Sequence, residues 1–462
     1  MNFRTTLDFL LHDWLNVNAL TSRERFADHS RDTFDAVLDT CERIARDKFA
    51  PFNRLVDTQE PRTETLPDGS LRVVLPQATA DAYRAYVESG MLSAAQAFEL
   101  GGMQLPYVVE AAANAFFSKA SVGIGGFGLL TTGNANLLMA HGTPMQQAVF
   151  AHNEFSGRWA GTMCLSEPQA GSSLGDVSTR AVPDLGADSP AQCMGDGVVP
   201  WDQDPLGARY RLKGHKMWIS AGDHELTDNI VHLVLAKIPD EHGRLPAGVK
   251  GISLFIVPKF LVQLPSLTVR DEGFAAAVMP GPRNDVALAG LNHKLGWRGT
   301  SNALLNFGEG TYPVPSAAGQ SGAPSAGAVG YLVGQPGRGL QYMFHMMNEA
   351  RINVGMAATM LGLAGYEASL DYARTRTQGR ALNATGKDVA TAPLRIIEHA
   401  DVKRMLLAQK AYCEGALALE LFCARLVDEQ HTAEPAAADD ARLLLEVLTP
   451  IAKSWPSEWC LE

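Results

Sequence analysis

Two short segments combine residue types that could bind a flat aromatic ring and a phosphate. Residues 163–173 read as an apolar strand, a Ser-Glu-Pro turn and an Ala-Gly-Ser-Ser loop, and residues 216–220 are Lys-Met-Trp-Ile-Ser. An indole can cover the face of a ring, and a hydroxyl can reach a ring heteroatom. Glycine lets the backbone approach a phosphate without a clash from Cβ.

The pair of segments resembles the two flavin-contacting segments of the acyl-CoA dehydrogenase family, and the resemblance covers most of residues 35–430. It implies an FAD protein that acts on acyl-CoA thioesters. In the family, backbone N–H groups and a hydroxyl serve the flavin edge, which becomes electron-rich on reduction. By this resemblance, the residues that contact FAD are Met163, Leu165, Ser166, Gly171, Ser172, Trp218, Ile219 and Ser220.

The match departs from the family pattern at two positions. Ser166 stands where threonine is common and keeps the hydroxyl, whereas Ser173 stands where aspartate is common and loses a charge. Each segment alone could also be purely structural, the first a strand with an ordinary proline turn and the second a strand with a core tryptophan. The order and separation of the two segments favour the flavin interpretation.

Two further segments match the family by resemblance. Residues 346–355 resemble the helix that serves the acyl-CoA site, where Asn348 and Arg351, together with Ser172, would contact the substrate. A long-lived positive charge suits an anionic thioester ligand. Residues 372–380 resemble the helix end from which Arg376 and Gln378 reach the FAD pyrophosphate of a neighbouring subunit. The alternatives are an exposed helix face and a solvated basic helix terminus.

The family's catalytic carboxylate is missing from its expected place. The family reaction needs a base for the α-proton, and that base sits in a Tyr-Glu-Gly-Thr-like motif near the C-terminus. Neither this motif nor the preceding Gly-Gly segment follows Trp455. We therefore expect the catalytic base beyond residue 462, in a chain truncated at its C-terminus.

Two carboxylates within the chain could be mistaken for that base. Glu414 lies in Tyr-Cys-Glu-Gly, inside a predicted helix whose apolar register places it on a solvent face. Some family members carry the base directly before the arginine of the acyl-CoA helix, but here that position is Ala350. Glu349 precedes it by one residue, and one helical step rotates a side chain by about 100°. Glu349 is therefore the lesser candidate.

The chain reads as helices, then short strands, then helices. Helical spacing dominates residues 30–155, and the C-terminal helices are predicted at 339–376, 393–429 and 441–454. The β-prone runs are 159–165, 209–212, 230–236, 252–257 and 303–307. Residues 183–208 and 268–290 look like loop insertions, and 315–330 like a flexible connection.

This order predicts an α+β fold like that of the acyl-CoA dehydrogenases. We expect an N-terminal helical domain over 1–157, a central antiparallel β-domain over 158–312 and a C-terminal helical bundle over 313–462. A chain of 462 residues exceeds what one core usually serves.

Composition excludes several classes of protein. The 46% apolar and 19% charged residues are typical of a soluble globular chain, and the net charge of −11 argues against a nucleic-acid surface. No window holds about 18 uninterrupted apolar residues, so a membrane span is not expected. The six scattered cysteines support neither disulfides nor a metal site, and we expect a cytoplasmic protein.

The resemblance implies an FAD-dependent acyl-CoA dehydrogenase that passes electrons to an electron-transfer flavoprotein and forms a homodimer or homotetramer. The long N-terminal region and the insertions favour the larger bacterial-type members. A non-catalytic relative that binds flavin or acyl-CoA, a family oxidase or flavin monooxygenase, and a purely structural helical protein remain the alternatives.

Overall fold

The computed structural model describes residues 3–184, 202–315, 324–383, 386–387 and 390–462. The helices and strands follow the predicted order of helical, β and helical regions, which confirms the α+β class. The chain forms two compact units. The helical unit comprises Met1–Ala50, Gln104–Val122 and Arg351–Glu462, and the β unit comprises Pro51–Met103 and Gly123–Ala350. The three sequential domain ranges remain predictions.

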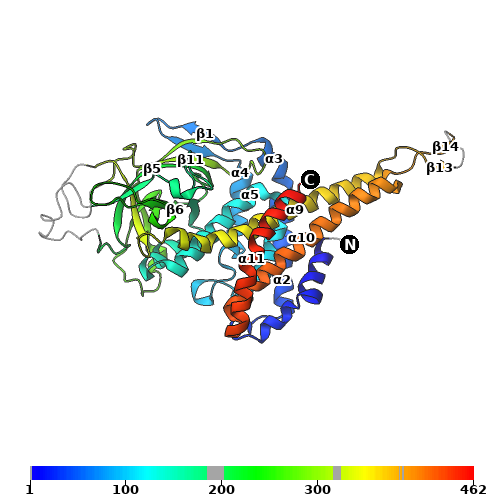
Figure 1. Ribbon diagram of the computed structural model, residues 1–462, viewed down its shortest axis with the longest axis horizontal. Coiled ribbons are helices and arrows are strands. Elements are labelled where there is room, and N and C mark those ends of the chain that lie inside the picture. The colour runs from blue at the N-terminus through cyan, green and yellow to red at the C-terminus, as the bar shows by residue number, and fades with distance from the viewer. Residues whose placement is uncertain (1–2, 185–201, 316–323, 384–385, 388–389) are drawn as a thin grey trace, which may run out of the picture. The chain divides into compact units, whose positions relative to one another are not determined.

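The helical unit is built from long helices and their short extensions. Its elements are α1 (Phe3–Asp8), α2 (Arg31–Ile44), the first part of α5 (Tyr107–His141), most of α9 (Gly339–Thr375), α10 (Ala400–Thr432) and α11 (Pro435–Trp459). Helix α10 packs along α11 (Figure 1). Ser30 begins α2 with a capping box, because its side chain and that of Thr33 each accept from the other's backbone N–H.

The β unit holds the sheet. Its strands are β1 (Arg62–Thr65), β2 (Leu71–Val74), β3 (Trp159–Cys164), β4 (Arg180–Pro183), β5 (Arg209–Ser220), β6 (Asn229–Lys237), β7 (Ile252–Pro258), β8 (Phe260–Gln263), β9 (Met279–Arg283), β10 (Val286–Leu291), β11 (Asn302–Phe307) and β12 (Ala328–Val333). Its helices are α3 (Asn53–Thr58), α4 (Gln77–Glu88), α6 (Pro144–Gln146), α7 (His152–Phe155) and α8 (Phe274–Ala277), with the rest of α5 and the start of α9.

Eight strands in the described residues form one sheet, in the order β10-β11-β5-β12-β7-β6-β3, with β4 beside β5 and β6. Most pairs are antiparallel as predicted, but β3 and β4 each pair with β6 in parallel. Side chains alternate between two apolar clusters. Leu233 and Leu254 belong to the cluster that includes α5 and α9, whereas Val234 and Phe255 face the cluster with β11.

Several sequence predictions need correction. Residues 30–155 also contain the β1–β2 hairpin, and the presumed loop 268–290 contains α8, β9 and most of β10. The flexible connection over 315–330 already includes the start of β12, while residues 316–323 lie outside the described residues, as does most of 183–208. The predicted helix 441–454 starts earlier, at Pro435. No described helix combines the length and the hydropathy that a bilayer span needs.

Candidate functional site

Strand β3 delivers the first predicted flavin segment. It is the last strand in the sheet order, so the chain leaves the sheet at its edge after Cys164. Met163 is half-buried, and so are Leu165 and Ser166, which follow directly. Met163 and Leu165 pack against the cluster that includes Met346 of α9. The predicted contact residues therefore lie at an accessible border of the sheet.

A tight turn then presents the loop. The backbone of Glu167 and that of Ala170 exchange two hydrogen bonds, at 2.8 and 3.0 Å. Gly171, Ser172 and Ser173 follow, and all three are exposed. No described atom lies within 4 Å of the position that a Cβ on Gly171 would occupy. Packing within the described chain therefore does not explain why this residue is glycine. A phosphate bound close to the backbone would explain it, because a Cβ would obstruct its approach.

Trp218 occupies a strained place in β5. The pairing of β5 with β11 shifts between Lys216 and Ile219, so two residues of β5, Met217 and Trp218, stand opposite one. Trp218 has φ +63°, a left-handed conformation that costs an L-residue about 1–2 kcal/mol. Its side chain is 50% exposed, which contradicts a core tryptophan. Strain that displays a large aromatic ring is typical of a binding site.

The other residues of the second segment differ in accessibility. Ile219 is buried in the apolar cluster that includes β11, so its backbone alone could serve a ligand. Ser220 is half-buried at the end of the strand.

The two flavin segments meet in the β unit. The backbone N–H of Met217 donates to the carbonyl oxygen of Ser166 at 3.1 Å. Beside it, Lys216 Nζ donates to Leu165 O at 2.8 Å and to Glu167 Oε1 at 2.9 Å. Sequence reasoning missed Lys216 and Glu167. The sequence did contain a signal, because each segment has a charged residue at a position that faces the interior.

A half-buried carboxylate lies in α9. Glu349 accepts a hydrogen bond from Asn136 Nδ2 at 2.9 Å, and Gln96 Nε2 donates to the oxygen of the same amide at 2.8 Å. His345 Nε2 lies 3.8 Å from the other carboxylate oxygen. Burial raises the pKa of Glu349 to about 7, against the opposing effect of Asn136, although 21% of the side chain stays accessible. Asn348, beside it, is half-buried.

The remaining predicted site residues belong to the helical unit. Arg351 is half-buried in α9, whereas Arg376 and Gln378 are exposed in the turn that follows this helix. Hydrogen bonds from Gln378 N to Leu394 O and from Ile396 N to Arg376 O hold that turn. Glu414 lies in α10 and is half-buried rather than on an open solvent face, because it pairs with Lys410 and accepts a hydrogen bond from Thr6 at 3.2 Å.

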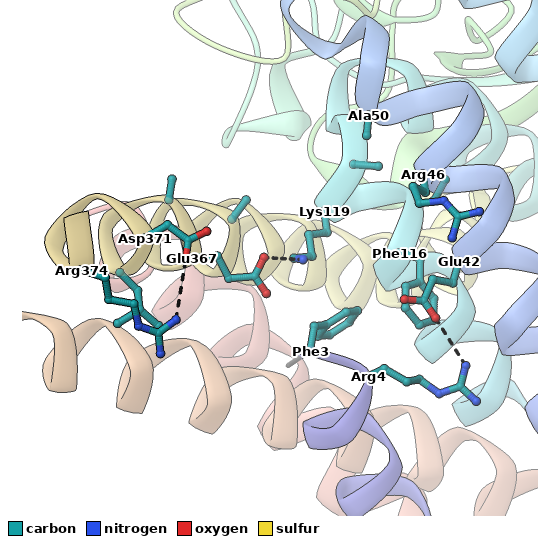
Figure 2. Close-up of a pocket in the computed structure, with 15 residues that line it drawn as sticks. Phe3, Arg4, Glu42, Arg46, Ala50, Phe116, Lys119, Glu367, Asp371 and Arg374 are labelled. Carbon is teal, nitrogen blue, oxygen red and sulfur yellow. Dashed lines mark ion pairs between the residues drawn. The ribbon is translucent and has the colours of Figure 1, made fainter. Parts of the chain in front are cut away.

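The helical unit also contains a cavity of about 720 Å³ (Figure 2). The charged side chains of its lining are paired with carboxylates or basic groups of the same unit. Lys119 lies 2.5 Å from Glu367, and Arg374 lies 3.7 Å from Asp371. Arg4, on its wall, also donates to Asp8 and Asp35, which with His12 could otherwise hold a cation. This internal pairing leaves little charge for a ligand.

Known proteins resemble the chain over nearly its full length. It is 35% identical over 453 residues to the 3-methylmercaptopropionyl-CoA dehydrogenase of Ruegeria pomeroyi, with 98% of this chain and 66% of the relative covered. It is 32% identical over 465 residues to the broad-specificity linear acyl-CoA dehydrogenase FadE5 of Mycobacterium tuberculosis, with 97% and 65% covered. No family model matches.

A solved structure shares the fold. The acyl-CoA dehydrogenase of Bacillus anthracis, solved in complex with FAD, superposes with a TM-score of 0.64 at 18% identity, over 94% of this chain and 59% of that one. The chain thus spans about two thirds of the length of the curated relatives that it matches. It belongs to the acyl-CoA dehydrogenase family, and within it to the larger bacterial type.

Proposed function

We propose that this protein binds FAD and dehydrogenates the Cα–Cβ bond of an acyl-CoA thioester. The observation that carries the proposal is the junction of the two predicted flavin segments. Ser166 and Met217 are hydrogen-bonded to each other, and the next residue, Trp218, displays its indole from a strained backbone. The family's FAD chemistry supplies a hydride acceptor for the β-carbon.

The residues around this junction fit the cofactor by their chemistry. The half-buried Ser166 offers a hydroxyl and Leu165 a backbone N–H to the edge of a ring, while Met163 offers an apolar contact. Trp218 offers a flat wall, and Ser220 a second hydroxyl. The exposed Gly171 and Ser172 leave room for a pyrophosphate.

Glu349 is the carboxylate that we propose to test as the proton acceptor. A general base works best when its pKa lies near the working pH, and the pKa of Glu349 is about 7. Asn136 fixes one oxygen of this carboxylate and leaves the other beside His345. A carboxylate outside the described residues is the alternative source of the base.

We propose the substrate and partner contacts from the family pattern. Ser172, Asn348 and Arg351 would contact acyl-CoA, and Arg376 and Gln378 would reach the pyrophosphate of a neighbouring subunit. This requires a homodimer or homotetramer, and electrons would pass to an electron-transfer flavoprotein in the cytoplasm. The Ruegeria relative is named for the 3-methylmercaptopropionyl group and the Mycobacterium relative for linear acyl groups. A series of acyl-CoA esters is therefore the suitable probe.

An anaerobic titration tests the proposal. The purified protein is reconstituted with FAD and mixed with acyl-CoA esters of increasing chain length, while the visible flavin absorbance is recorded. We expect bound flavin and its bleaching by at least one ester. If flavin binds but no ester bleaches it, the proposed reaction is contradicted, and the alternative of a non-catalytic flavoprotein remains. Bleaching that survives Glu349→Gln would exclude Glu349 as the base.

A further inference from the structure

Lys216 is a charged residue in the interior of the sheet. Its side chain is fully buried, and that of its partner Glu167 is 1% exposed. Removing a charge from water is costly unless the charge is paired and hydrogen-bonded. A buried ion pair is weak evidence for stability, and in some proteins such a pair specifies the local geometry instead.

The ammonium group of Lys216 makes two hydrogen bonds to the first flavin segment. It donates to the carbonyl of Leu165 at 2.8 Å and to the carboxylate of Glu167 at 2.9 Å. The next residue, Met217, donates its backbone N–H to Ser166 at 3.1 Å. Residues 165, 166 and 167 of one flavin segment are therefore each bound to residue 216 or 217 of the other.

Glu167 also closes the loop that leaves the first segment. Its Oε1 accepts from the backbone and hydroxyl of Thr179, at 3.0 and 2.6 Å. Its Oε2 accepts from the backbone and hydroxyl of Ser178, both at 2.8 Å, and from Gln169 Nε2 at 2.8 Å. One carboxylate thus holds both ends of the loop that contains Gly171 and Ser172.

These contacts keep the carboxylate ionised. Burial alone would raise the pKa of Glu167, but Lys216 and the hydrogen bonds from Thr179 and Ser178 outweigh burial and lower that pKa to about 2. Burial lowers the pKa of Lys216, and the charge of Glu167 opposes this change. The pair is therefore an ammonium–carboxylate bond in a dry environment.

We propose that Lys216 and Glu167 are positioning residues for the flavin site. Both side chains are buried, so they would not contact the flavin themselves. They hold the 165–167 turn against the 216–218 bulge, so that Ser166, the Gly171 loop and the strained Trp218 face one ligand in a fixed arrangement. This inference rests on the proposed flavin function.

The pair is tested with three variants of the full chain. Lys216→Met and Glu167→Gln each break the bond, and the double variant Lys216→Met/Glu167→Met removes both charges without stranding either one. Asp184→Asn is the matched control, because the buried Asp184 forms ion pairs with two arginines of β5, Arg209 at 2.7 Å and Arg211 at 3.0 Å. FAD affinity, the visible circular dichroism of bound flavin and urea stability are measured for each.

We expect the double variant to fold and to bind FAD at least about tenfold more weakly, with altered flavin circular dichroism, as when an outer hydrogen-bond partner is lost. Asp184→Asn should lose stability without a comparable loss of FAD affinity. Unchanged FAD affinity and spectrum in the folded double variant would overturn the inference. Equal losses in the control would reduce the pair to a general structural role. A wild-type chain that binds no FAD would instead refute the proposed function.

Discussion

The backbone N–H of Met217 donates to the carbonyl oxygen of Ser166 at 3.1 Å, which joins two segments that lie fifty residues apart in the chain. This bond places a serine hydroxyl and the strained, half-exposed Trp218 on neighbouring backbone. This is where we propose that a flavin binds, and the local structure explains how the chain could display its contacts.

Replacing Trp218 separates backbone strain from ligand binding. Trp218→Gly and Trp218→Ala both remove the indole, so both should weaken FAD binding. Only glycine adopts φ +63° without a steric cost, so the glycine variant should be more stable than the alanine variant by about 1 kcal/mol. Urea unfolding of the FAD-free proteins measures the difference. Equal stabilities would show that the left-handed backbone is not retained.

A methyl group on Gly171 should affect binding but not folding. The space around its Cβ position is open, and its φ is not in the left-handed region. Gly171→Ala should therefore change the free energy of unfolding by less than about 0.5 kcal/mol while reducing FAD affinity. Gly290→Ala is the control, because Gly290 is equally open but lies in β10. Equal FAD affinity in both variants would remove Gly171 from the site.

The carboxyl group of Glu349 should make stability fall as pH rises. Its folded pKa of about 7 exceeds the ordinary value of 4.5, so between these pH values the folded chain keeps a proton that the unfolded chain has lost. The cost grows to about 3 kcal/mol above pH 7. Glu349→Gln should remove this cost, which urea unfolding at pH 4.5 and pH 8 would reveal. If the difference in unfolding free energy between wild type and Glu349→Gln were the same at both pH values, the raised pKa would be refuted.

Glu167 should have the opposite pH dependence. Its folded pKa of about 2 lies below the ordinary 4.5, so its stabilisation is complete above pH 4.5 and disappears as pH falls to about 2. The stability difference between wild type and Glu167→Gln should shrink by about 3 kcal/mol across that window. Unfolding curves at pH 6, 4 and 2.5 would measure it, and a gap that does not shrink would argue against an ionised buried carboxylate.

The sequence predicted the elements whose local pattern is strong. The apolar runs at β3, β6 and β7 and the long C-terminal helices are confirmed because their periodicity follows directly from burial. The β1–β2 hairpin was missed because β1 is exposed along its whole length, although Asp68-Gly69 is a typical hairpin turn. The parallel pairing of β3 with β6 depends on contacts distant in sequence, which local patterns do not encode.

The candidate site was predictable only where a residue could contact a ligand directly. The family resemblance predicts Trp218 and Gly171 as ligand contacts, but the bulge that displays Trp218 depends on its pairing with β11. Lys216 and Glu167 were passed over because charged residues in short polar segments usually face water. Their burial follows from the meeting of β3 and β5, a tertiary event.

Titration of the purified chain with FAD tests the central claim most directly. We expect stoichiometric binding, with a structured visible flavin spectrum that is altered in the double variant Lys216→Met/Glu167→Met and retained in Asp184→Asn. A folded wild-type chain that leaves FAD free in solution would contradict the assignment of residues 163–173 and 216–220 as a flavin site.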